Sequence, residues 1–116
     1  MRKASAQLIL SGRTDIVALD IIEYDSKNNR IGYLEFTCEL HHAIFFETTL
    51  WSSYLYLRKL KDYYSSVCFK RDEIRELVDD LENYKMYINM KYIVDYNALI
   101  EFLKNDKAER AVFEGD

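Results

Sequence analysis

The chain has 116 residues, of which 49% are hydrophobic and 15% aromatic, and its formal net charge is −4. This length predicts one domain with a single core, and this apolar content excludes an intrinsically disordered chain. The negative charge argues against a protein whose whole surface binds duplex nucleic acid.

The sequence also predicts where the protein works. The N-terminal apolar run covers only Leu8 to Leu10, and no run approaches the roughly 18 apolar residues that span a bilayer. Cys38 and Cys68 are then expected to stay reduced, so we expect a cytoplasmic protein. Ten Tyr and no Pro fit A/T-rich codons, which suggests a bacterial or phage source.

Three early segments alternate apolar and polar residues, the pattern of a half-buried β-strand. They cover residues 5–11, 16–24 and 31–40, and short polar links separate them. The clearest inward face consists of Leu34, Phe36, Cys38 and Leu40. The spacing predicts an antiparallel meander.

The middle of the chain fits more than one pattern. Residues 42–50 are rich in β-branched and aromatic side chains, which favours a fourth strand. Residues 50–64 fit either a helix or a pair of strands. We expect the helix, because the segment is long and has no internal turn.

A helix is predicted over residues 72–84, after a short apolar strand at 67–69. Apolar residues there recur every three or four positions, and Asp72 stands where an N-cap is expected. The predicted buried stripe is Ile74, Leu77, Val78, Leu81 and Tyr84.

After this helix the period becomes alternating, so residues 86–92 predict another strand. Asp95 is expected to cap a final helix that ends near Asn105. Residues 106–116 form a polar tail that is expected to fray, although Phe113 has the character to dock. The chain thus predicts a single α+β domain over residues 1–116. Its mostly antiparallel sheet has a three- to four-stranded N-terminal meander and one or two later strands, covered by two or three helices.

The outer face of the 72–84 helix is the main candidate for a partner-binding surface. Its carboxylates repel one another at i, i+4 spacing, and such a face attracts a cationic partner and speeds association. A purely solvated face is the alternative. Exposed carboxylates on one helix lack the desolvation that acid–base catalysis needs. With tyrosines as interface contacts, the predicted binding residues are Asp72, Glu73, Glu76, Asp79, Asp80, Glu82, Tyr84 and Tyr87.

Other chemistries find weaker support. Cys38, His41 and His42 form the one metal-like cluster, but a zinc site usually needs four ligands and no second pair follows. A thiol nucleophile there would lack a visible orienting group. Asp20 and Glu35 stand on adjacent predicted strands like a nuclease carboxylate pair, but the expected lysine is absent. We therefore expect no metal and no cofactor, and no phosphate-binding loop is present.

A basic run at residues 58–61 lies near several tyrosines, a combination that can stack nucleic-acid bases. Lysines that cover a tyrosine-lined core edge explain it equally well. Because the rest of the chain is acidic, direct nucleic-acid binding is not expected.

These observations favour a small acidic intracellular protein-binding module without catalysis, which neutralises a partner by occupying its surface. The partner would carry an electropositive surface, as a toxin, nuclease or nucleic-acid-binding protein does. Bacterial toxin immunity proteins and phage inhibitors are similar in size, charge and lack of catalytic signature, although no motif is shared. Two alternatives stay open: a small metal- or thiol-dependent enzyme using Cys38, His41 and His42, and a homodimeric structural subunit joined through an exposed edge strand.

Overall fold

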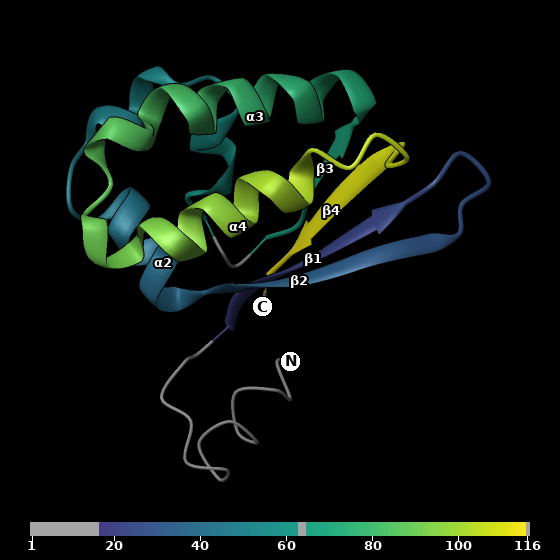
Figure 1. The fold of residues 1–116 in the computed structure, drawn as a ribbon, viewed down its shortest axis with the longest axis horizontal. Helices are drawn as coiled ribbons and strands as arrows, with labels where there is room; N and C mark the ends of the chain where they lie inside the picture. The colour runs from purple at the N-terminus through teal and green to yellow at the C-terminus, as the bar shows by residue number, and fades with distance from the viewer. Residues whose placement is uncertain (1–16, 63–64, 116) are drawn as a thin grey trace, which may run out of the picture.

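The framework of the protein is an antiparallel sheet of four strands in the order β2-β1-β4-β3 (Figure 1). The computed structural model describes residues 17–62 and 65–115. The strands are β1 (Val17–Tyr24), β2 (Arg30–Thr37), β3 (Val67–Lys70) and β4 (Arg110–Glu114). Together with the helices they confirm the predicted α+β class.

The helices of the described residues lie on one side of this sheet. They are α2 (Cys38–Phe45), α3 (Arg71–Tyr84) and α4 (Ile93–Leu103). Short 3₁₀ turns connect them, namely η1 (Leu50–Ser53), η2 (Leu57–Leu60), η3 (Lys85–Tyr87) and η4 (Met90–Tyr92). In Figure 1, α3 and α4 run across one face of the sheet, and α2 follows directly on β2.

The β1–β2 hairpin forms because its turn residues supply the hydrogen bonds that the backbone needs. The Asp25 carboxylate accepts from the backbone N–H of Lys27 at 2.9 Å and of Asn29 at 2.8 Å. The bond from Asn29 is the main reason that the pKa of Asp25 is lowered. Asn28 takes a positive φ of 67°, a conformation that asparagine tolerates better than most residues.

The core lies between the inner sheet face and the helices. Phe69 and Phe113 meet edge to face at 5.4 Å on neighbouring strands. Two buried tyrosines satisfy their hydroxyls by bonding to backbone carbonyls: Tyr96 donates to Leu81 at 2.6 Å and Tyr84 to Ile44 at 2.9 Å. The sheet residues of this core are Leu19, Ile21, Phe36, Phe69, Ala111 and Phe113. The two tyrosine bonds join α4 to α3 and α3 to α2.

The predicted strand over residues 42–50 is wrong, since α2 begins at Cys38 and ends the predicted 31–40 strand early. The Thr37 hydroxyl caps this helix by accepting from the backbone N–H of Leu40 at 3.2 Å. Leu40 and Ile44, four residues apart, are both buried. Helical burial therefore overrides the β propensity of the segment.

Two further segments form 3₁₀ turns where longer elements were expected. Residues 50–60 fold as η1 and η2, neither the predicted helix nor strands, and residues 63–64 lie outside the described part. The predicted strand at 86–92 is η3 and η4. Met86 and Met90 are exposed while Ile88 between them is buried. These three residues therefore do not share one face, as they would in a strand.

The polar tail predicted for 106–116 is also wrong, because residues 110–114 form β4, which pairs with both β1 and β3. Ala111 and Phe113 are fully buried, so Phe113 docks as anticipated. α4 starts at Ile93, which places Asp95 inside its first turn and not at its cap. The predicted strand at 5–11 lies outside the described residues.

A buried carboxyl group sits under the end of α4. Glu23 on β1 is 1% exposed, and its Oε1 accepts from the Asn105 amide at 3.3 Å. Among the described residues no hydrogen-bond partner is found for Oε2. Gly32 on β2 leaves room for this side chain, since a Cβ there would lie 3.0 Å from Oε1. Burial raises the pKa of Glu23 above its ordinary value of 4.5.

We expect Glu23→Gln to stabilise the protein by about 1 kcal/mol at pH 7, because it removes a buried and incompletely paired charge. The raised pKa means that the folded state binds the proton more tightly than the unfolded state. Acidification therefore stabilises the wild type, and the advantage of Glu23→Gln shrinks as the pH falls toward the unfolded value near 4.5. Urea unfolding at several pH values measures this difference, with the exposed Glu39→Gln as control. A difference independent of pH would contradict the prediction.

Candidate functional site

The predicted acidic helix exists as α3, and its geometry explains the sequence pattern. Ile74, Leu77, Leu81 and Tyr84 are buried, as predicted from their spacing. The N-cap position is Lys70 and not Asp72, which falls in the first turn. The Glu73 carboxylate reaches back to accept from the backbone N–H of Lys70 at 3.0 Å.

Two of the six predicted carboxylates have structural roles. Glu73 satisfies the start of α3, as described above. Asp80 is half-buried, and its Oδ2 accepts from the backbone N–H groups of Tyr56 at 2.8 Å and Leu57 at 3.1 Å. This carboxylate therefore fastens the η2 turn to α3 and faces inward.

Two more carboxylates form ion pairs with the protein's own cations. Asp72 lies 3.5 Å from Arg75, and Glu82 lies 3.4 Å from Lys104. Glu82 raises the pKa of Lys104. Such exposed pairs contribute little stability, but they lower the charge that the helix presents to a partner.

The remaining carboxylates, Glu76 and Asp79, are exposed, and neither forms an ion pair within the described residues. Of the six predicted carboxylates, only these two are exposed without an ion pair to a described residue. A carboxylate ridge this short is a weak attractant on its own.

The predicted tyrosine contacts separate into one buried and one exposed residue. Tyr84 is fully buried, and Thr48 Oγ1 lies 2.9 Å from its hydroxyl, so it has no surface to offer a partner. Burial raises its pKa. Tyr87 is 39% exposed and packs against Tyr84 with ring centroids 5.3 Å apart. Tyr87 alone is placed for outside contact.

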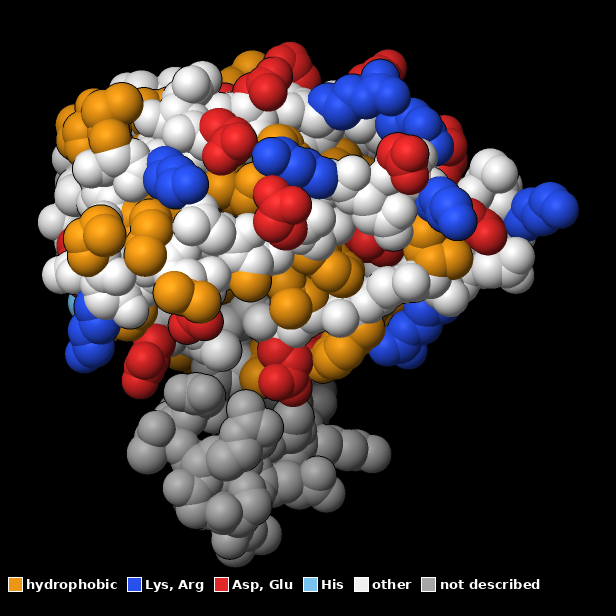
Figure 2. All heavy atoms as spheres, viewed as in Figure 1, with side chains coloured by type: hydrophobic (Ala, Val, Ile, Leu, Met, Phe, Trp, Pro, Cys, Tyr) orange, Lys and Arg blue, Asp and Glu red, His pale blue; other side chains and the backbone are white. Residues whose placement is uncertain are grey.

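An apolar surface beside Tyr87 escaped the sequence prediction. Met86, Met90 and Val94 are 76%, 77% and 76% exposed. With Tyr87 they form what we call the methionine patch, at the connection between α3 and α4. Figure 2 shows apolar side chains gathered at the left end of the molecule, where Figure 1 places this connection. Exposed methionines are adaptable contacts and recur at binding surfaces.

In the strand predicted for residues 86–92, Met86, Ile88 and Met90 would share one face. In a 3₁₀ turn the same apolar residues point outward, because the turn buries only Ile88. The sequence pattern after α3 therefore indicates a buried strand, whereas the structure has exposed methionines there.

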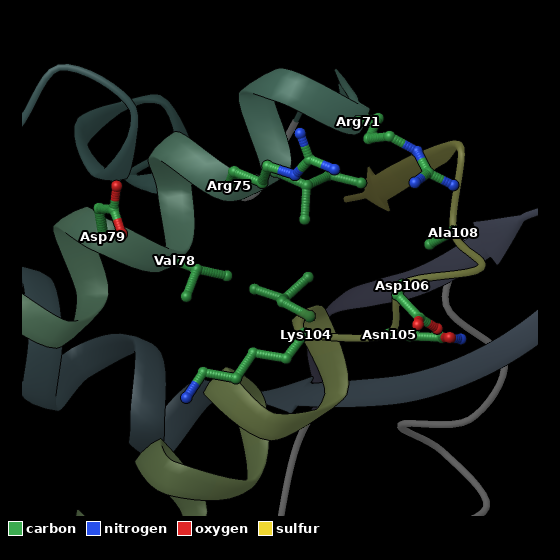
Figure 3. A pocket seen from close by; sticks show the side chains of 10 residues that line it. Arg71, Arg75, Val78, Asp79, Lys104, Asn105, Asp106 and Ala108 are labelled. Atoms are coloured by element: carbon green, nitrogen blue, oxygen red, sulfur yellow. The ribbon is translucent and has the colours of Figure 1, made fainter.

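A groove of about 220 Å³ runs between α3 and α4. Figure 3 shows Arg71 and Arg75 along one side and Lys104 on the other. Each of these three cations forms an ion pair. Arg71 lies 3.3 Å from Glu109, Arg75 lies 3.5 Å from Asp72, and Lys104 lies 3.4 Å from Glu82. The apolar lining comes from Ile74, Val78, Leu103 and Ala108. No histidine or cysteine lines this groove.

The candidate metal or thiol cluster is divided between core and surface. His41 is 1% exposed, its Nε2 lies 2.8 Å from the Leu60 carbonyl oxygen, and burial lowers its pKa. His42 is exposed and stacks on Phe46 at 5.4 Å. Cys38 is half-buried at the start of α2. Within residues 17–62 and 65–115, no group of three or more His, Cys, Asp or Glu side chains is arranged to hold a metal ion.

The lysines of the basic run at residues 58–61 lie over aromatic rings, which fits the interpretation that they cover an edge of the core. The Lys59 ammonium lies 4.9 Å from the centre of the Tyr56 ring and 6.0 Å from that of Phe69. Lys61 lies 5.8 Å from Phe46. These lysines cover the aromatic edge of the core.

No protein-family model, curated protein or solved structure matches the chain. Of the helices that the structure describes, none is both long enough and apolar enough to cross a membrane. The functional inference therefore rests on the surfaces described above.

We expect Asp80→Ala to lower the free energy of unfolding by about 2 kcal/mol, because two backbone N–H groups lose their acceptor. Asp79→Ala is the matched control on the neighbouring position, and its effect should stay within about 0.5 kcal/mol. Chemical denaturation of both variants measures the two values. Equal effects would show that Asp80 is merely a surface carboxylate.

Proposed function

We propose that this protein is a non-catalytic protein-binding module that acts by occupying the surface of a partner, as inhibitors and immunity proteins do. The observation that supports this most is the methionine patch. Three apolar side chains that lie close together in sequence at the α3–α4 connection are each about three-quarters exposed, and exposed apolar surface of this kind marks binding sites when it is contiguous.

The patch also indicates what kind of partner would fit. Its neighbours in sequence are mixed in charge, with Glu82 and Asp95 on one hand and Lys85 and Lys91 on the other. Affinity would come from apolar contact at the centre, where hot spots usually lie. The net charge of −4, with Glu76 and Asp79 exposed, would steer an electropositive partner toward the protein.

A cytoplasmic location belongs to the same proposal. Cys38 and Cys68 are not joined in a disulfide, and Cys68 is exposed. Free thiols persist where the compartment is reducing.

The enzyme alternative gains no comparable support. A Cys38–His41 or Cys38–His42 pair would need a histidine free to take a proton, but the His41 ring is engaged with the Leu60 carbonyl inside the core. The described residues offer no observation that favours this alternative over the binding module.

The patch can be tested with Met90→Asp combined with Val94→Asp. We expect this variant to fold normally but to bind at least ten times more weakly to a protein that the wild type captures from its native cells. Leu55→Asp is the matched control, because Leu55 is a 52% exposed apolar residue elsewhere on the surface. Binding constants for the purified pair give the comparison. If the patch variant binds like the wild type, the patch is not the contact surface.

The electrostatic steering of the partner is tested separately with the double substitution Glu76→Lys and Asp79→Lys. We expect the association rate with the same partner to fall several-fold at low salt, with little change in the dissociation rate. The wild-type association rate should fall with salt more steeply than that of the variant. Asp80 is left unchanged, because its reversal would disturb the η2 turn. Identical salt dependence of both proteins would contradict the steering role.

A further inference from the structure

Two of the chain's three methionines lie in the methionine patch, where solvent reaches their sulfur atoms. Among the described residues, Met86, Met90 and Val94 are the most exposed of the large apolar side chains. The remaining methionine, Met1, lies outside the described residues. A thioether in contact with solvent is open to attack by peroxides, which a buried thioether escapes. The surface proposed to bind a partner is therefore also a chemically sensitive one.

The two turns that carry these methionines, η3 and η4, are held by other groups. Ile88 lies between the turns, is 6% exposed and anchors the connection in the core. Its backbone N–H donates to the Lys85 carbonyl at 3.1 Å. In η4 the Asn89 side chain accepts from the backbone N–H of Lys91 at 2.9 Å. Because these contacts need no methionine side chain, a chemical change at the sulfur atoms should leave both turns folded.

We propose that Met86 and Met90 form a modification site, at which oxidation by a peroxide changes the methionine patch from apolar to polar. This inference rests on the proposed function, because it concerns the regulation of the same surface. In the reaction, each thioether sulfur gives an electron pair to one oxygen of hydrogen peroxide. The O–O bond breaks, the sulfur is oxidised to a sulfoxide, and the peroxide is reduced, with its other oxygen leaving as water.

The sulfoxide reverses the property on which the methionine patch depends. A thioether is apolar and adapts its shape to a partner, whereas a sulfoxide is polar and accepts hydrogen bonds from water. Burying that oxygen against an apolar partner without a hydrogen bond is unfavourable. Of the three most exposed side chains in the patch, only Val94 would keep its apolar character. A partner held by this surface would therefore dissociate after oxidation.

Methionine oxidation is reversible, which makes it suitable for regulation. Methionine sulfoxide reductases restore the thioether, with one class of enzyme for each configuration at the sulfur. Two thiol groups are oxidised to a disulfide in that step, and the sulfoxide oxygen leaves as water. Because Met86 and Met90 both project from the surface, their sulfoxides are accessible to such an enzyme. The balance of oxidation and reduction would then set the fraction of the protein that can bind.

The effect of the methionines has to be separated from that of Cys68, whose thiol is also exposed. Cys68 lies on β3 and not at the α3–α4 connection, so its oxidation should leave the methionine patch unchanged. Dithiothreitol reduces sulfenic acids and disulfides of cysteine, whereas methionine sulfoxide needs its own reductase. Treatment with peroxide followed by dithiothreitol therefore isolates the methionine change. Cys68→Ser provides the matched control.

The modification is tested on the full-length protein alone. After peroxide and dithiothreitol, peptide mass spectrometry should find one added oxygen atom on each of Met86 and Met90, and circular dichroism should show an unchanged fold. The oxidised protein should elute earlier from a phenyl column, as should oxidised Cys68→Ser. Met86→Leu combined with Met90→Leu, which keeps the apolar volume, should elute at one position before and after treatment. Methionines that resist peroxide as a buried thioether does, or unchanged elution of the oxidised wild type, would overturn the proposal.

Binding to the purified partner of the patch test shows whether oxidation regulates it. The oxidised wild type should bind about tenfold more weakly than the reduced protein. The double leucine variant should bind like the reduced wild type, with or without peroxide. Equal binding of oxidised and reduced wild type, or loss of binding by the leucine variant after peroxide, would overturn the regulation. A reduced wild type that binds normally despite Met90→Asp and Val94→Asp would instead overturn the proposed function, while the phenyl column would still decide the modification.

Discussion

β4 pairs with β1 along one edge and with β3 along the other, so five residues near the C-terminus join the N-terminal hairpin to the helical half of the chain. β3 runs directly into α3, and α4 leads back into β4. Because Ala111 and Phe113 are buried at the centre of this arrangement, the inner face holds α3 and α4 in place. The α3–α4 connection, which carries the methionine patch, therefore depends on this one insertion.

The sequence predicted well those elements whose residues bury in a regular period. The stripe on α3 and the alternation in β1 and β2 depend on local periodicity, and periodicity is visible without a structure. The fold class followed from these segments. The predictions failed for short apolar segments, because strands, helices and turns can have the same composition over a short stretch. α2 depends on the Thr37 cap. β4 is stabilised by strand neighbours that lie forty or more positions away in sequence on β3, and further away on β1. Contacts of this kind leave no local signal.

The acidic helix shows why composition alone does not identify a binding surface. Carboxylates look alike in sequence, yet Asp80 serves the η2 turn, Glu73 serves the start of α3, and Glu82 pairs with Lys104. Their roles depend on which backbone groups the fold brings near them. The fold likewise decides that Met86 and Met90 are exposed and not buried. Apolar residues that the fold leaves exposed, rather than its carboxylates, are now the main evidence for a binding function.

The central claim is that the protein acts through exposed apolar surface and not through a reactive pocket. Methyl NMR tests it most directly, because Met86, Met90 and Val94 carry methyl groups at the surface and Val78 and Leu103 carry them in the α3–α4 groove. When the purified partner is added, the account predicts that the signals of Met86, Met90 and Val94 shift together while those of Val78 and Leu103 stay in place. Shifts confined to Val78 and Leu103 would contradict it.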